Sequence, residues 1–115
     1  MPRSEPAVLV VTEDAIAQFA HLGPDAALVC ARLGFVCREQ ATPGRAEASL
    51  RELEAHTGLR KDRVARSLAR LAHAGVVVPI GRSKRRGGPT IFELHLDRVG
   101  IVVDLHDLTW RGLAS

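Results

Sequence analysis

The chain has 115 residues, of which 46% are apolar, 25% are charged and 3% are aromatic. These values are ordinary for a globular protein, and a chain of this length can bury a core without metals or disulfides. No apolar stretch approaches the roughly 20 residues of a membrane span, and the first residues do not resemble a signal peptide, so we expect a cytoplasmic protein. The lack of Tyr argues against an aromatic platform for single-stranded nucleic acid.

The net charge of +3 is distributed unevenly along the chain. Residues 45–86 carry eleven Arg and Lys against four Asp and Glu, a net charge of +7, whereas the remaining residues together carry −4. A domain with one basic segment presents an oriented electric field to its partners. Arg outnumbers Lys by fourteen to two, which we interpret as the codon bias of a GC-rich bacterial source.

Two helices are predicted in the first forty residues. Ala7 to Val11 favour either a short strand or an arm that packs on the body. Thr12 can cap the first helix, whose first turn holds two acids. We expect its buried face to consist of Ile16, Phe19 and Ala20. The second helix starts at Pro24 and is mostly apolar, which predicts a central buried helix running to about Glu39.

Two shorter helices joined by a tight turn are predicted next. The loop 41–48, whose end is compatible with a short strand, leads into Ser49 and Glu52, which form an S-x-x-E capping box. Thr57-Gly58 ends this helix, because Gly adopts the left-handed conformation of a sharp turn. The following helix is expected from about Arg60 to His73. Its apolar stripe is predicted to be Val64, Leu68 and Leu71.

A β-hairpin with a basic tip follows these helices. Its strands are predicted at Val76–Ile80 and Thr90–Leu96. Pro79 cannot donate to a ladder, so it should lie on an edge strand or at a bulge. The tip between the strands holds four cations in five positions: Arg82, Lys84, Arg85 and Arg86. Beyond it, Ile101–Val103 favour a strand or an extended arm, and Asp107 can cap a short last turn with Trp110.

This order of elements resembles a winged helix-turn-helix domain. The pattern is carried by Leu50, Leu53, Thr57, Gly58, Leu59, Val64, Leu68, Leu71, Gly75, Val76 and Val77. The resemblance is to bacterial transcriptional regulators and to plasmid and phage replication initiators. It covers roughly residues 24–96, with 1–23 as an N-terminal arm and helix and 97–115 as a C-terminal extension. The fold class is therefore expected to be mainly α with a small antiparallel β-sheet, that is, α+β.

The resemblance implies that the partner is double-stranded DNA, with the second helix of the pair in the major groove and the hairpin on phosphates or the minor groove. The expected base-reading residues are Lys61, Asp62, Arg63, Arg66 and Ser67. Arg63 and Arg66 are the main candidates, because Arg binds guanine through two hydrogen bonds. The expected phosphate and wing contacts are Arg60, Arg70, Arg82, Lys84, Arg85 and Arg86. The family often has a capping Ser or Thr at the position of Arg60, so that helix lacks a cap worth about 1 kcal/mol.

The simpler alternative is that the charged helix face and the hairpin tip are only solvated surface. Four cations beside Gly87-Gly88, together with the segregated charge, favour contact with DNA. Gly87-Gly88 should let the tip bend toward the sugar-phosphate chain. The tip cations are expected to be too dense to pack on protein.

No enzyme motif is present, and no catalytic residue, cofactor or metal site is expected. Cys30 and Cys37 are interpreted as small core residues, since seven residues along a helix separate them by about 10 Å, beyond disulfide reach. The five His residues lack zinc-site spacing. Asp97, Asp104 and Asp107 are interpreted as surface residues in preference to a nuclease site.

Three functions remain open at this point. The first is a sequence-specific transcriptional regulator that acts as a homodimer, with its dimer surface either on the N-terminal helix or on Val102, Leu105, Leu108 and Trp110. The second is a replication or partition component of a plasmid, phage or integrative element, whose C-terminal segment would bind another protein. The third is a winged-helix module whose basic face binds an acidic protein.

Overall fold

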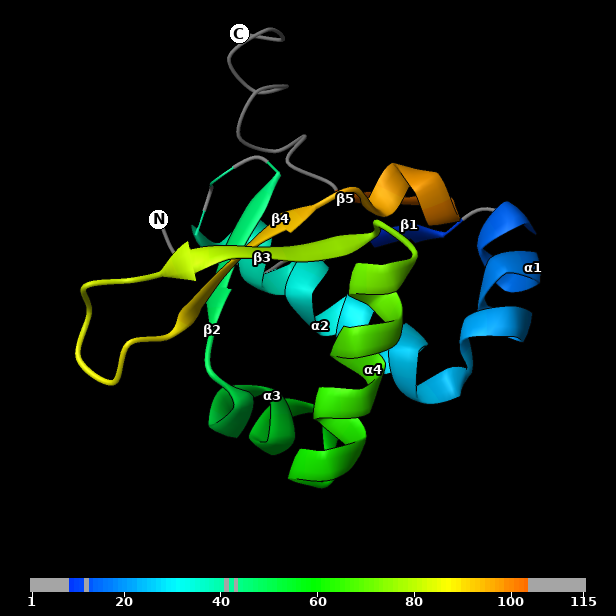
Figure 1. Ribbon diagram of the computed structural model, residues 1–115. Helices are drawn as coiled ribbons and strands as arrows, with labels where there is room; N and C mark the ends of the chain where they lie inside the picture. Colours follow the sequence, from blue (N-terminus) through cyan, green and yellow to red (C-terminus); the bar gives the residue numbers. More distant parts are fainter. Residues whose placement is uncertain (1–8, 12, 41, 43, 104–115) are drawn as a thin grey trace, which may run out of the picture.

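The computed structural model describes residues 9–11, 13–40, 42 and 44–103. Their elements, drawn in Figure 1, are β1 (Leu9–Val11), α1 (Glu13–Leu22), α2 (Pro24–Gln40), β2 (Arg45–Ala48), α3 (Leu50–Thr57), α4 (Lys61–His73), β3 (Val77–Arg82), β4 (Thr90–Leu94), the 3-10 helix η1 (Leu96–Val99) and β5 (Ile101–Val103). The chain is mainly helical with a small three-stranded antiparallel sheet. The predicted α+β class is therefore confirmed.

The three-stranded sheet has the order β2-β4-β3, and all its pairs are antiparallel. The predicted hairpin is thus present, although β4 ends at Leu94 and the chain then turns into η1. The register between β3 and β4 shifts between Pro79 and Gly81. Both alternatives for Pro79 are confirmed, because β3 is an edge strand and the irregularity begins directly after this residue. Figure 1 shows the hairpin projecting beyond the helices, away from α1.

A separate two-stranded sheet joins β1 to β5, pairing Leu9 with Val103 and Val11 with Ile101. The strand alternative is therefore confirmed for Ile101–Val103 and, within the first segment, for the described residues Leu9–Val11. Their mutual pairing was not predicted, since 89 residues lie between the end of β1 and the start of β5. The cap predicted at Asp107, together with Leu105, Leu108 and Trp110, lies outside the described residues.

The core is built around α2, as predicted. Its buried residues include Val29, Cys30, Leu33 and Cys37, and α2 packs on α1, α3, α4 and β2. The prediction of a buried helix fails at Leu28, whose side chain is 48% exposed. The expected face of α1 is right for Phe19, which packs against the core, but wrong for Ile16, which is 71% exposed, and for Ala20, which is exposed. The residues of α1 that face the core follow an i, i+4, i+7 spacing and are Ala15, Phe19 and Leu22.

The turn between α3 and α4 is built as its sequence predicts. The Ser49 hydroxyl accepts a hydrogen bond from the Glu52 amide at 3.1 Å, and the Glu52 carboxylate accepts one from the Ser49 amide at 2.9 Å. Gly58 has φ 76° and donates its N–H to the Glu54 carbonyl. Arg60 is the extended N-cap of α4 and makes no side-chain cap bond, as its departure from the pattern predicts. This turn sets the start of α4.

Within the described residues, no helix combines the length and the apolarity that crossing a membrane requires.

Gly58 of this turn and Gly81 of β3 provide a matched pair of glycine substitutions. Gly58→Ala should lower the free energy of unfolding by about 1–2 kcal/mol, because a Cβ is strained in the left-handed region. Gly81→Ala adds the same methyl group where φ is not left-handed and no atom lies within 4 Å. It should change the free energy of unfolding by about 0.5 kcal/mol or less. Urea denaturation of both variants measures the difference, and equal losses would contradict the conformational argument.

Candidate nucleic-acid interface

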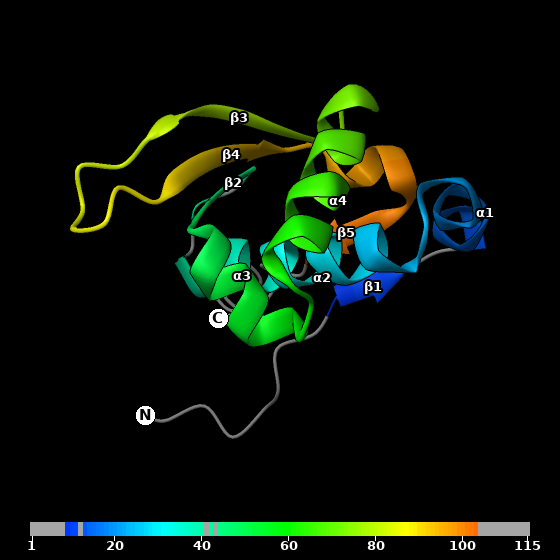
Figure 2. The same cartoon turned by 60° about the horizontal axis from the view of Figure 1, so that its bottom comes forward.

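Helix α4 presents one ridge to solvent. Val64, Ser67 and Leu71 are buried on its inner side. With about 100° of rotation per residue, the ridge opposite this stripe holds Asp62, Arg66, Ala69 and His73, all of which are exposed. Helix α4 lies between the hairpin on one side and α1 on the other in both views (Figures 1 and 2). The two flanks of the ridge therefore face different neighbours.

Three of the predicted residues at the start and on the ridge of α4 are available to a ligand. Arg60, Lys61 and Arg66 are exposed and make no hydrogen bond or ion pair with any residue that the structure describes. Asp62 is also exposed and lies on the same ridge as Arg66, one helical turn earlier. These positions could reach base edges or phosphates without first breaking a contact within the protein.

Ser67 is not available, and the expectation that it reads a base is corrected. Its exposed fraction is 3%. It lies three residues after Val64 and four before Leu71, so it belongs to the buried stripe of α4. A serine is small enough to be accommodated in the core where α4 packs on α2. Its polarity misled the prediction, because the spacing alone places it inside.

Arg63 and Arg70 lie on the flank that faces the turn between α1 and α2. Arg63 donates from Nε to Asp25 Oδ2 and from Nη2 to Asp25 Oδ1, both at 2.8 Å. Arg70 donates from Nη1 to the Leu22 carbonyl at 3.2 Å. The hydrogen bonds to Asp25, and then the charge of this carboxylate, raise the pKa of Arg63. Both side chains therefore have protein partners, which the sequence did not indicate.

The hairpin tip, defined as residues 82–89, is only partly free. Arg82, Lys84 and Arg86 are exposed and lack partners among the described residues. Arg85 instead donates from Nε to Glu47 Oε1 on β2 at 3.0 Å. The expectation that no tip cation packs on protein is thus wrong for Arg85. Since β2 lies beside β4, Glu47 can reach the base of the tip.

A hollow of about 500 Å³ lies between the tip and the first turn of α3. Arg85, Arg86 and Gly87 line one side, and Ser49, Arg51 and Glu52 line the other. Sequence analysis missed Arg51 as a site residue. The capping box that starts α3 could have located it, because this box places Arg51 in the first turn, directly after the strand that pairs with the hairpin.

An apolar groove of about 320 Å³ runs along the other flank of α4. It is lined by Ala48, Leu50, Ala65, Leu68, Ala69, Ala72, Pro79, Thr90 and Phe92. Sequence analysis missed it. The available signal was the run of alanines at positions 65, 69 and 72 beside the predicted apolar stripe of α4.

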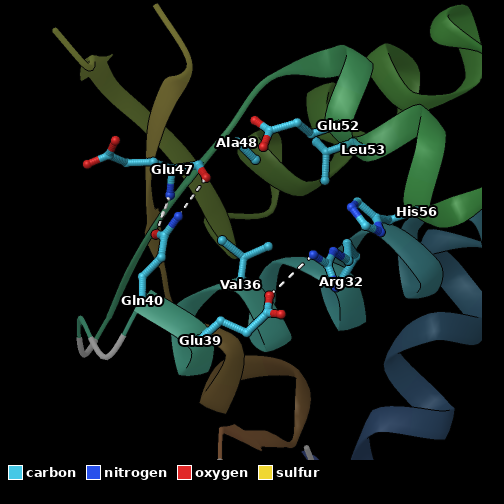
Figure 3. A pocket seen from close by; sticks show the side chains of 9 residues that line it. All are labelled: Arg32, Val36, Glu39, Gln40, Glu47, Ala48, Glu52, Leu53 and His56. Carbon is cyan, nitrogen blue, oxygen red and sulfur yellow. Dashed lines mark hydrogen bonds and ion pairs between the residues drawn. The ribbon is translucent and has the colours of Figure 1, made fainter. Parts of the chain in front are cut away.

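Figure 3 shows a further pocket of about 200 Å³ between α2, β2 and α3. Arg32 donates to Glu39 at 3.2 Å, and the Gln40 side chain makes two hydrogen bonds with the backbone of Glu47. Three of the residues that line it are glutamates: Glu39, Glu47 and Glu52. Arg32 pairs with Glu39 and Arg85 of the hairpin tip pairs with Glu47, so the three glutamates keep a net negative charge and the pocket is unsuited to a phosphate. The two hydrogen bonds of Gln40 to the Glu47 backbone hold β2 against α2.

The two cysteines are buried and free, as predicted for core residues. Burial raises the pKa of the Cys30 thiol from 9.0 to about 12. The Cys37 thiol donates to the Thr42 carbonyl at 3.1 Å. Among the residues that the structure describes, no three His, Cys, Asp or Glu side chains come together in a way that could hold a metal ion.

No protein-family model matches the chain, and no curated protein or solved structure matches it. A functional assignment therefore rests on the residues and on the geometry described above.

The burial of Cys30 predicts that its thiol reacts slowly in the folded protein. In the folded protein at pH 8, Cys30 should react with a thiol reagent such as Ellman's reagent far more slowly than after unfolding, because its thiolate is disfavoured and covered.

The raised pKa of Cys30 also means that the fold is more stable while this thiol is neutral. This stabilisation is complete below about pH 9 and should be lost as the pH rises toward 12. Rapid labelling of Cys30 in Cys37→Ala protein under native conditions would contradict its burial.

Proposed function

We propose that residues 24–96 form a winged helix-turn-helix domain and that the protein binds double-stranded DNA in a sequence-specific manner, as a bacterial transcriptional regulator. One observation carries this proposal: six exposed cations on two elements have no partner among the described residues. They are Arg60, Lys61, Arg66, Arg82, Lys84 and Arg86. The order strand, helix, tight turn, helix and basic hairpin supports it as well.

Non-specific affinity for DNA comes largely from the release of counterions. DNA phosphates hold a condensed layer of cations, and each Arg or Lys that replaces one of them releases it into solution. Cations that are already paired within the protein contribute less, because their own ion pair must be given up. The six unpaired cations therefore supply most of the non-specific affinity that we expect.

Sequence specificity is expected to come from the ridge of α4. A helix fits the major groove of B-DNA, where each base pair presents a distinct pattern of donors, acceptors and methyl groups. Arg66 suits guanine, and Asp62 can accept from the amino group of cytosine. We therefore propose Arg66 as the principal base reader, with Lys61 and Asp62 beside it.

A homodimer remains part of the proposal, since two copies would double the site and raise both affinity and specificity. Of the two predicted dimer surfaces, the N-terminal helix is supported by Ile16, whose apolar side chain is 71% exposed on α1. The C-terminal surface lies outside the described side chains.

A second function is favoured by the apolar groove on α4. A module that binds an acidic protein could place apolar side chains in the groove between Leu68 and Phe92 and acidic ones on the surrounding cations. DNA carries a much denser charge than an acidic protein, so the salt dependence of duplex binding separates the two functions.

A footprint separates regulation from replication. Protection of an operator at a promoter would indicate a transcriptional regulator, and protection of an array of repeats near an origin would indicate a replication component.

Duplex binding should depend steeply on salt. We expect log Kd to change with log salt with a slope near 0.9 for each phosphate neutralised, for roughly 4–8 phosphates per protomer. Lys84→Ala and Arg86→Ala should each reduce that slope by about 1 and weaken all sequences alike. Arg98→Ala removes the same charge from η1 and should leave the slope unchanged. Fluorescence anisotropy at several salt concentrations measures these slopes, and a flat dependence would favour the protein-binding module.

Arg66 should set the base preference at one position of the preferred sequence. Arg66→Ala is expected to weaken binding to the preferred duplex by about 1–3 kcal/mol and to relax the preference at one base pair. Selection from a random DNA pool, followed by titration of single-base variants, measures both effects. Arg70→Ala is the matched control, because it removes an equal charge from α4 at a residue expected to contact phosphate, so the variant should leave the base preference unchanged. An unchanged preferred site in Arg66→Ala would remove Arg66 as a base reader.

A further inference from the structure

The ion pair between Asp25 and Arg63 connects two parts of the chain that lie 38 residues apart. Asp25 stands in the first turn of α2, where a carboxylate is favoured by the helix dipole. Both of its oxygens accept hydrogen bonds from one edge of the Arg63 guanidinium, each at 2.8 Å. The Arg63 side chain nevertheless stays 51% exposed, while that of Asp25 is 29% exposed. The pair is therefore fixed in geometry but open to solvent on one side.

The geometry of the pair leaves part of Arg63 unused. A guanidinium has five N–H donors, and the pair uses the donor on Nε and one of the donors on Nη2. Both donors on Nη1 and the second donor on Nη2 remain. Two of these three, one on Nη1 and one on Nη2, lie along the end of the planar group, which is the edge that can donate two parallel hydrogen bonds to guanine O6 and N7. The bond to Asp25 thus occupies the side edge and spares the end edge.

Holding Arg63 before binding changes what binding requires of it. A free arginine side chain samples many rotamers, and this conformational entropy is lost when the side chain is held against a base. Arg66, which has no partner among the described residues, would lose this entropy on binding, whereas Arg63 has already lost much of it. The Asp25 carboxylate also repels DNA phosphates, and this repulsion lowers the affinity for every duplex alike. Asp25 should therefore raise discrimination while lowering affinity for arbitrary duplexes.

We propose that Asp25 is a positioning residue that orients Arg63 toward one guanine of the preferred site, an inference that rests on the proposed function. This assigns a specificity role to a residue of α2, outside the pair of helices α3 and α4 that carries the resemblance to DNA-binding domains.

The test uses the full chain and the duplex that it selects from a random pool. Each guanine of this duplex is replaced in turn by 7-deazaguanine, which lacks the N7 acceptor. We expect at least one position where the replacement weakens wild-type binding by about fivefold or more. In Arg63→Ala and in Asp25→Ala the penalty at this same position should shrink toward onefold. The double variant should lose no more than either single variant, because the two residues act as a unit.

Two further variants separate positioning from simple changes of charge or folding. Asp25→Asn keeps the size of the side chain but can accept with only one oxygen, so its penalty at that guanine should fall between those of wild type and Asp25→Ala. Asp97→Ala removes an equal charge from η1 and should leave the penalty at the wild-type value. Affinity for a random duplex should stay equal or rise in Asp25→Ala.

The possible failures are distinguishable. If the wild-type chain selects no duplex, the proposed function fails and takes this inference with it. If the wild type selects a duplex but the 7-deazaguanine penalties are the same in Asp25→Ala, the DNA-binding proposal survives and the role of Asp25 is overturned. Tighter binding of the preferred duplex by Asp25→Ala with its penalty retained would show that Asp25 competes with DNA for Arg63, which also overturns the inference.

Discussion

The burial of Val64 and Leu71 against the rest of the core sets the rotation of α4 about its own axis, and most of what this protein offers to a partner depends on that rotation. Once these side chains are inside, Arg66 has to point outward, Arg63 has to face the α1–α2 turn, and Ala65 has to face the hairpin. A rotation of one residue, about 100°, would exchange these roles. The packing of α4 is therefore a constraint on recognition as much as on stability.

The same constraint divides the cations of residues 45–86 into two classes. Some have acquired protein partners: Arg63 with Asp25, Arg70 with the Leu22 carbonyl and Arg85 with Glu47. Others have none among the described residues, and these lie at the start and on the ridge of α4, on the hairpin tip, on β2 (Arg45) and in the first turn of α3 (Arg51). The paired cations lie where their element touches another element, so their number follows from packing. The unpaired ones lie where the elements project, and there only an external anion could neutralise them.

Local structure was predictable wherever its cause lies within a few residues. The Ser49–Glu52 capping box, the left-handed Gly58 and the missing cap at Arg60 all follow from side chains and backbone one turn apart, and all three are present. Faces of helices were less predictable. The apolar Ile16 suggested a buried position, but α1 packs on the core through Ala15 and Phe19. The prediction for Ser67 was wrong in the opposite direction. Its polarity suggested an exposed position, whereas its spacing from Val64 and Leu71 places it in the core.

The sequence by itself therefore determined where helices start and stop, that a basic hairpin follows the helix pair, and how much positive charge the segment carries. The tertiary structure alone decided which of these charges are free. Asp25 is 38 residues from Arg63, and Glu47 is 38 residues from Arg85, so neither pair leaves a trace in local spacing. The pairing of β1 with β5 was decided in the same way. The physical reason is that these contacts depend on how α2 and the sheet are placed in space, and that placement is a property of the whole core.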